Sequence, residues 1–156
     1  MTATVLEHKT EKLQEKRKPL IYLASPHSHL DPFVREQRCQ LVMRAWVYLF
    51  ELGKLVFSPI LHTHEAAKDY LGLENGFELY RELDERMISV CDEVWILAIE
   101  GWKESVGVQA EIAYAKSLGK EVKVVGFYWL QRVPSSYLIW SYEPMNIESM
   151  QGRMVK

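Results

Sequence analysis

Residues 93–99 read Glu-Val-Trp-Ile-Leu-Ala-Ile, an almost continuous apolar run that predicts a buried β-strand. A loop at 100–105 follows, and the apolar spacing of residues 106–118 then favours a helix that Gly119 ends. Residues 122–127 are apolar again and predict a further strand. A strand, a helix and a second strand in this order are typical of a parallel sheet with a crossover connection.

The same alternation precedes this unit. Residues 20–24 and 55–57 predict two short strands, each of which stops at a Ser-Pro pair. Between these strands, Asp31 is expected to cap a helix that Gly53 closes. Residues 77–91 predict another, amphipathic helix. The chain therefore predicts an α/β protein, whose parallel sheet carries helices on both faces.

Two finer expectations concern the middle of the chain. Residues 62–76 are expected to form a long loop with at most one helical turn. The amphipathic helix after it is expected to bury one apolar face. The residues expected on that face are Leu79, Leu83, Met87, Ile88 and Val90.

Composition excludes several classes of protein. The 156 residues suit one domain, expected at 19–156 behind a flexible arm at 1–18. A net charge of −2 argues against binding to duplex nucleic acid through bulk electrostatics. No run approaches the roughly 20 apolar residues of a membrane span. Residues 1–18 lack the apolar core of a signal peptide, and Cys39 and Cys91 are expected to be buried free thiols. A cytoplasmic protein is therefore expected.

Polar side chains follow the expected strands at one edge of the sheet, where ligands of such sheets bind. They are Ser25, His27, Ser28 and His29 after the first strand, Ser58, His62 and His64 after the second, and Glu100, Glu104, Ser105 and Glu111 after the third. Four of the five histidines thus lie in two short segments, which predicts a site at this edge.

Three pieces of the sequence carry a family resemblance. They are residues 22–26 (Tyr-Leu-Ala-Ser-Pro), Asp84, and residues 105–115, which begin Ser-Val-Gly-Val-Gln-Ala-Glu. Over residues 20–127 the chain resembles the nucleoside 2-deoxyribosyltransferase superfamily. It is similar in particular to an uncharacterised bacterial and phage branch, a domain of unknown function of the 1937 type. The resemblance implies a three-layer sandwich of the flavodoxin or Rossmann type, with a mostly parallel sheet of four to five strands.

The resemblance also implies a chemistry, the cleavage or exchange of an N-glycosidic bond without a cofactor. Glu111 matches the nucleophile of the family, and Asp84 matches the acid that handles the proton of the leaving base. Tyr22 matches a position after the first strand that orients the nucleophile or touches the sugar. Ser105 and Gly107 would hold the 5′-hydroxyl or 5′-phosphate of a small-molecule nucleoside or nucleotide.

Other residues are candidates for contacts to such a ligand. Ser25, His27, Ser58 and His62 are expected to bind it, and Trp102 either stacks on the base or packs within its loop. The arginine that holds phosphate in related monophosphate hydrolases is missing after the first strand, since Arg35 and Arg38 come later.

Two alternative functions remain open from the sequence. The chain could be a nucleotide-binding or sensor module without catalysis. It could also be a metal-dependent hydrolase, in which the pairs His27/His29 and His62/His64 each offer two imidazoles to one ion. A homo-oligomer is expected in each case, because the tail is rich in aromatic residues that a monomer does not need. These residues are Trp129, Tyr137, Trp140 and Tyr142, whereas Trp46 and Trp95 are expected in the core.

Overall fold

Four parallel strands form a single sheet in the order β2–β1–β3–β4. The structure is a computed structural model, and it describes residues 17–67 and 77–126. The strands are β1 (Leu20–Ala24), β2 (Leu55–Phe57), β3 (Glu93–Leu97) and β4 (Glu121–Val125). All four strands lie where the apolar runs predict them.

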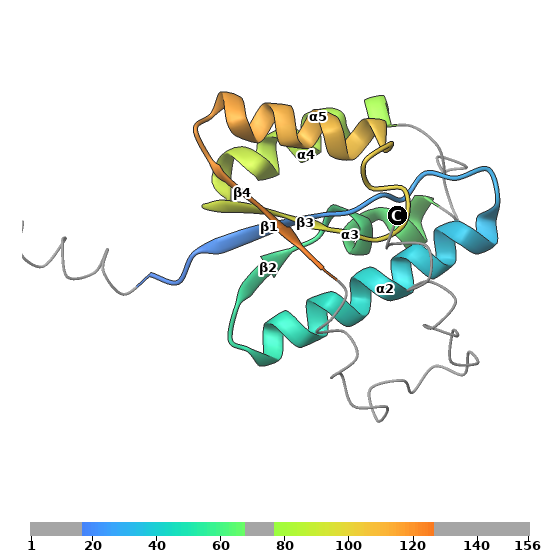
Figure 1. Ribbon diagram of the computed structural model, residues 1–156, viewed down its shortest axis with the longest axis horizontal. Coiled ribbons are helices and arrows are strands. Elements are labelled where there is room, and N and C mark those ends of the chain that lie inside the picture. Colours follow the sequence, from blue (N-terminus) through green and yellow to red (C-terminus); the bar gives the residue numbers. More distant parts are fainter. Residues whose placement is uncertain (1–16, 68–76, 127–156) are drawn as a thin grey trace, which may run out of the picture.

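Helices cover both faces of the sheet, which confirms the expected α/β class (Figure 1). They are α2 (Pro32–Glu51), α3 (Pro59–Ala66), α4 (Phe77–Val90) and α5 (Val106–Ser117). Figure 1 shows α4 and α5 on one side of the sheet and α2 on the other. The result is a Rossmann-like sandwich of three layers.

Each face of the sheet has its own apolar core, because successive side chains of a strand point to opposite faces. Tyr22 and Ala24 of β1 join the core under α4 and α5, whereas Leu23 joins the core under α2. This alternation turns the hydroxyl-bearing side chain of Tyr22 toward the layer of α4 and α5. Trp46 and Trp95, expected in the core, are partly buried, and Trp95 packs against the core under α2.

The helix ends follow the sequence signals. Asp31 caps α2 by accepting the backbone N–H of Phe33 at 2.9 Å. Gly53 and Gly119 follow α2 and α5 with φ angles of 71° and 69°, in the left-handed region that favours glycine. Cys39 and Cys91 are buried thiols that form no disulfide, as expected, and burial raises the pKa of the Cys91 thiol to about 11.

The expected loop at 62–76 is wrong over its first part, because α3 begins at Pro59 and runs through His62 and His64. Ser58 caps this helix by accepting the N–H of Leu61 at 3.4 Å, and Pro59 stands at its first position. A Ser-Pro pair is a helix start signal as well as a strand stop.

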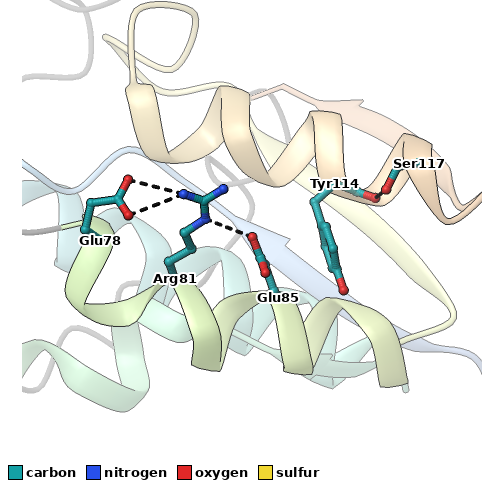
Figure 2. A network of polar contacts seen from close by, with 5 residues as sticks. All are labelled: Glu78, Arg81, Glu85, Tyr114 and Ser117. Carbon is teal, nitrogen blue, oxygen red and sulfur yellow. Dashed lines mark hydrogen bonds and ion pairs between the residues drawn. The ribbon is translucent and has the colours of Figure 1, made fainter.

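The inner face expected for α4 is also partly wrong. Leu83 and Val90 are 38% and 50% exposed, whereas Asp84 is only 7% exposed. Ile88 is fully buried, as expected, and the buried face also includes Asp84 and continues to Cys91, just after the helix. The outer face carries Glu78, Arg81 and Glu85, joined by ion pairs, beside the contact of Ser117 with Tyr114 on α5 (Figure 2). Met87, also expected on the inner face, packs against the core. The side chain of Leu79 lies outside the described part of the structure.

Several expectations fall outside the described residues. They concern most of the arm at 1–18, the segment 68–76, residue 127 and the aromatic tail with its implied subunit interface. Within residues 17–67 and 77–126, no helix is long and apolar enough to cross a membrane.

Candidate functional site

A pocket of about 300 Å³ opens at the edge of the sheet where β1 and β3 end. Four segments line it: the loop after β1, helix α3, helix α4 and the start of α5. Ser25, His27, His64, Asp84, Ser105, Gly107 and Glu111 are among its walls. The parallel arrangement of the strands therefore brings together residues that are far apart in the chain.

Two carboxyl groups lie in this pocket beside one buried phenol. Glu111 of α5 and Asp84 of α4 are each 7% exposed, and Tyr22 of β1 is fully buried. The Tyr22 hydroxyl donates to Glu111 Oε1 at 2.6 Å. Tyr22 does not line the pocket itself. It lies behind Glu111 and fixes the orientation of that carboxylate.

Burial raises the pKa of both acids. Burial raises the pKa of Glu111 to about 8, since the charge of Asp84 adds to it and the hydrogen bond from Tyr22 only partly opposes it. Burial likewise raises the pKa of Asp84 to about 6, against the stabilising Tyr22 hydroxyl. Burial and the two nearby carboxylates raise the pKa of Tyr22 itself. Between about pH 6 and pH 8 the two carboxyl groups thus hold one proton between them.

Two buried polar atoms in the pocket have no hydrogen-bond partner in the described part of the chain. They are Ser25 Oγ and Asp84 Oδ1. Buried polar atoms are nearly always paired, and an unpaired one in a pocket is a natural contact for a ligand. Both atoms therefore favour a polar ligand in this pocket.

The start of α5 supplies further polar groups. Ser105 caps the helix, its Oγ accepting the N–H of Val108 at 3.3 Å, and its hydroxyl hydrogen is left for another acceptor. Gly107 presents its backbone to the same pocket. The first turn of a helix also has free N–H groups that favour an electron-rich oxygen.

The histidines are paired differently from the sequence hypothesis. His27 Nε2 lies 2.8 Å from His64 Nδ1, so the close pair contains one imidazole from each segment. His29 Nδ1 accepts the N–H of Asp31 at 3.0 Å, and His62 is exposed beside the ring of Phe57. Residues two apart in a helix point away from each other, so α3 separates His62 from His64.

A different group of possible metal ligands exists in the described residues. One ligand atom each of Glu36, His64 and Glu65 lies within 4.8 Å of the others. His64 Nε2 is 3.0 Å from Glu36 Oε2 and 3.9 Å from Glu65 Oε1. The first of these contacts is a hydrogen bond, which already accounts for the closeness of the two groups.

Two other candidates do not line the pocket. Ser58 serves as the cap of α3, and Trp102 packs against the core cluster that contains Tyr22 and Val108. The structure thus favours the packing alternative for Trp102.

Arg35 and Arg38 support the pocket from behind. The guanidinium group of Arg35 donates to the carbonyl oxygen of His29, and that of Arg38 donates to Ser28 at 2.8 Å and to Glu100 at 3.2 Å. They fasten the loop after β1 to α2. Gly101 has φ of +87°, which favours glycine, and a Cβ there would displace the Arg38 guanidinium group, 2.6 Å away.

A protein-family model matches residues 19–127, under the description "Domain of unknown function (DUF1937)". The chain belongs to this family. The DUF1937 segment includes every described strand and helix and all residues that line the pocket. No curated protein matches the chain.

Sequence reasoning missed some pocket residues of this DUF1937 domain. Ile60 and Thr63 line the pocket because α3 is a helix, and Tyr80 lies one turn before Asp84. The Ser-Pro start of α3 was the available signal for the first two. Glu36 does not line the pocket, and its place beside the pocket residue His64 carried no signal, because it depends on how α2 packs on α3.

Proposed function

We propose that this protein breaks the N-glycosidic bond of a nucleoside and passes the sugar to water or to another base. The observation that carries the proposal is the pair of buried carboxyl groups, Glu111 and Asp84, in one pocket with Tyr22 bound to the first of them. Enzymes that cleave glycosidic bonds commonly use two carboxyl groups whose different surroundings give them different roles.

Glu111 would act as the nucleophile. Its Oε1 accepts from Tyr22, which leaves Oε2 for the anomeric carbon. A new bond forms between Oε2 and that carbon, while the electron pair of the carbon–nitrogen bond leaves with the base. The carboxylate stabilises the developing positive charge on the sugar. The hydrogen bond that the Tyr22 hydroxyl donates stabilises the ionised form of Glu111.

Asp84 would supply the proton. The leaving nitrogen of the base takes a proton from the Asp84 carboxyl group, which then accepts one from the incoming water or base. Its Oδ1 has no partner among the described residues and is free to face the ligand. Between about pH 6 and pH 8 the pair holds one proton, and the reaction would use the form in which this proton lies on Asp84 and Glu111 is ionised, although the higher pKa belongs to Glu111.

An uncharged nucleoside suits the pocket better than a nucleotide. Among the described residues, no Lys or Arg lines the pocket, while three carboxyl groups do (Asp84, Glu104 and Glu111). Arg35 and Arg38 donate to backbone carbonyl oxygens of the loop instead of facing the pocket. A phosphate would meet negative charge there, compensated only by the free N–H groups at the start of α5.

One observation favours a second candidate, a binding module without catalysis. With a pKa raised to about 8, Glu111 is mostly protonated at neutral pH, and a neutral carboxyl group binds without attacking. In that case the pocket would recognise a nucleoside and leave it intact.

Incubation with 2′-deoxynucleosides, ribonucleosides, their monophosphates and the dinucleotide NAD separates the two candidates. Base release, followed by chromatography, is expected from a nucleoside and is expected to vanish in Glu111→Gln. Glu85→Gln, on the partly exposed outer face of α4, serves as the matched control and is expected to keep full activity. Thermal stabilisation by a nucleoside without any base release supports the binding module. Equal release by wild type and Glu111→Gln rejects the assignment of the nucleophile.

A further inference from the structure

Four side chains form a continuous line of hydrogen bonds that ends at the pocket. Gln40 Nε2 donates to Glu36 Oε1 at 3.0 Å, and Glu36 Oε2 lies 3.0 Å from His64 Nε2. His64 Nδ1 in turn lies 2.8 Å from His27 Nε2. The line connects α2, α3 and the loop after β1, and the proposed chemistry of Glu111 and Asp84 makes no use of it.

The carboxylate at one end determines where the protons of the line lie. A carboxylate only accepts, so the contact with Glu36 requires a hydrogen on His64 Nε2. In a neutral His64 ring, Nδ1 is then an acceptor, and His27 must donate to it from Nε2. His27 Nδ1 is left with a lone pair. Burial is the largest cause that lowers the pKa of His27 to about 4, which keeps that ring neutral.

The surroundings hold His27 in place. His27 and His64 both line the pocket that contains Asp84 and Glu111. The loop that carries His27 is fixed by Arg38, which donates to the carbonyl oxygen of Ser28 at 2.8 Å. The two imidazole rings meet edge to face, with ring centres 5.1 Å apart. The acceptor on His27 is therefore set in one orientation before any ligand arrives.

We propose that His27 binds the ligand through Nδ1, as an acceptor for a hydroxyl or amino hydrogen of the nucleoside, and that Glu36 and His64 are positioning residues that hold His27 in this tautomer. The unpaired Asp84 Oδ1 is a second acceptor in the same pocket. The site thus selects a ligand that offers hydrogen-bond donors. The identity of the ligand as a nucleoside rests on the proposed function. The tautomer of His27 is independent of that function.

The tautomers are measured directly by ¹⁵N NMR of the histidine rings in the full-length protein. The signals are assigned with the single variants His27→Gln and His64→Gln. Both rings are expected to carry hydrogen on Nε2 and a bare Nδ1. Glu36→Gln is expected to give a mixture of tautomers at His27, and Glu51→Gln, exposed at the end of the same helix, is expected to leave both rings unchanged. Hydrogen on His27 Nδ1 in the wild type, or stoichiometric zinc in elemental analysis, overturns the proposal.

The ligand contact is tested by kinetics on whichever nucleoside is turned over. His27→Asn keeps an acceptor near the position of Nδ1, and His27→Gln does not. Loss of one hydrogen bond predicts that KM rises about tenfold in His27→Gln, with a smaller rise in His27→Asn and little change in kcat. Equal KM values in the two variants and the wild type overturn the contact.

The contact between His27 and a nucleoside can be tested even if the protein has no catalytic activity. If no nucleoside is turned over, the same ring signals are followed while 2′-deoxyadenosine and then the other nucleosides are added. A shift of the His27 signals with any of them supports the contact without catalysis. Unmoved His27 signals with all of them overturn it.

Discussion

Asp84 and Glu85 are neighbours in α4, but the helix turns them to opposite sides. The side chain of Glu85 is 36% exposed and accepts from Arg81 Nε at 2.9 Å, in the outer network of Figure 2. Asp84 is 7% exposed, lies in the pocket near Tyr22 and has an oxygen without a partner among the described residues. The outer acid is solvated and paired, so it contributes little to stability. The inner acid is held where a carboxyl group is costly, which is typical of a functional position.

The comparison predicts its largest effect on activity. Asp84→Asn is expected to lower kcat for base release by about a hundredfold or more, because the amide has no proton to give the leaving base. Glu85→Gln, one residue away, is expected to leave kcat unchanged. Steady-state rates of the two purified variants check this. Equal rates for both would mean that the burial of Asp84 has no part in the chemistry.

A second test concerns stability against pH. Asp84 and Glu111 have pKa values that rise on folding, from 3.8 to about 6 and from 4.5 to about 8. Between about pH 4 and pH 8 the folded protein therefore binds more protons than the unfolded chain. The free energy of unfolding falls as the pH rises through this range. The melting temperature is expected to drop on the order of 10–20 °C between pH 5 and pH 8 relative to a variant without these acids.

The matched variants isolate this effect. Asp84→Asn combined with Glu111→Gln is expected to flatten the pH dependence of the melting temperature, while Glu85→Gln keeps the wild-type slope. Calorimetry over the same buffers measures it. A double variant with the wild-type slope would show that other groups cause the pH dependence.

A smaller effect is expected at Tyr22. Tyr22→Phe removes the donor at 2.6 Å from Glu111 Oε1, which lowers stability by about 1 kcal/mol and raises the pKa of Glu111 further. The pH profile of kcat/KM is expected to be a bell with limbs near 6 and 8 in the wild type, and the upper limb moves to higher pH in the variant. If the upper limb does not shift, the Tyr22 hydroxyl does not influence the pKa of Glu111.

The smallest effect is expected on the outer face of α4. Arg81→Ala breaks its ion pairs with Glu78 and Glu85, all of them in solvent. Base release and the melting temperature are expected to stay within experimental error, because exposed pairs are screened and mobile. A marked drop in melting temperature would mean that the outer face matters more for the fold than the inner one.

The sequence predicted the fold well where local signals agree. The apolar runs mark all four strands, and Asp31, Gly53 and Gly119 mark helix ends. It failed at α3, because the Ser-Pro pair at 58–59 is both a strand stop and a helix start. It also placed Leu83 on the inner face of α4, where Asp84 lies instead. Apolar periodicity alone cannot find a helix face on which a functional acid replaces an apolar residue.

The site was predictable in part. The order of strands along the chain places Ser25, His27 and Glu111 at one edge, and the structure brings them into one pocket. The pairing of His27 with His64 was not predictable, since it depends on the helical phase of α3. The family resemblance singled out Tyr22 but did not place it behind Glu111. That position depends on which face of the sheet each side chain of β1 points to.

The central claim, that Glu111 attacks the sugar, is tested most directly by mass spectrometry of acid-quenched reactions. The protein is mixed with a 2′-deoxynucleoside, quenched during turnover, digested and mapped. A deoxyribosyl group is expected on the peptide that contains Glu111, with free base released, and neither is expected in Glu111→Gln. Base release without a sugar on Glu111, or release that persists in Glu111→Gln, would contradict it.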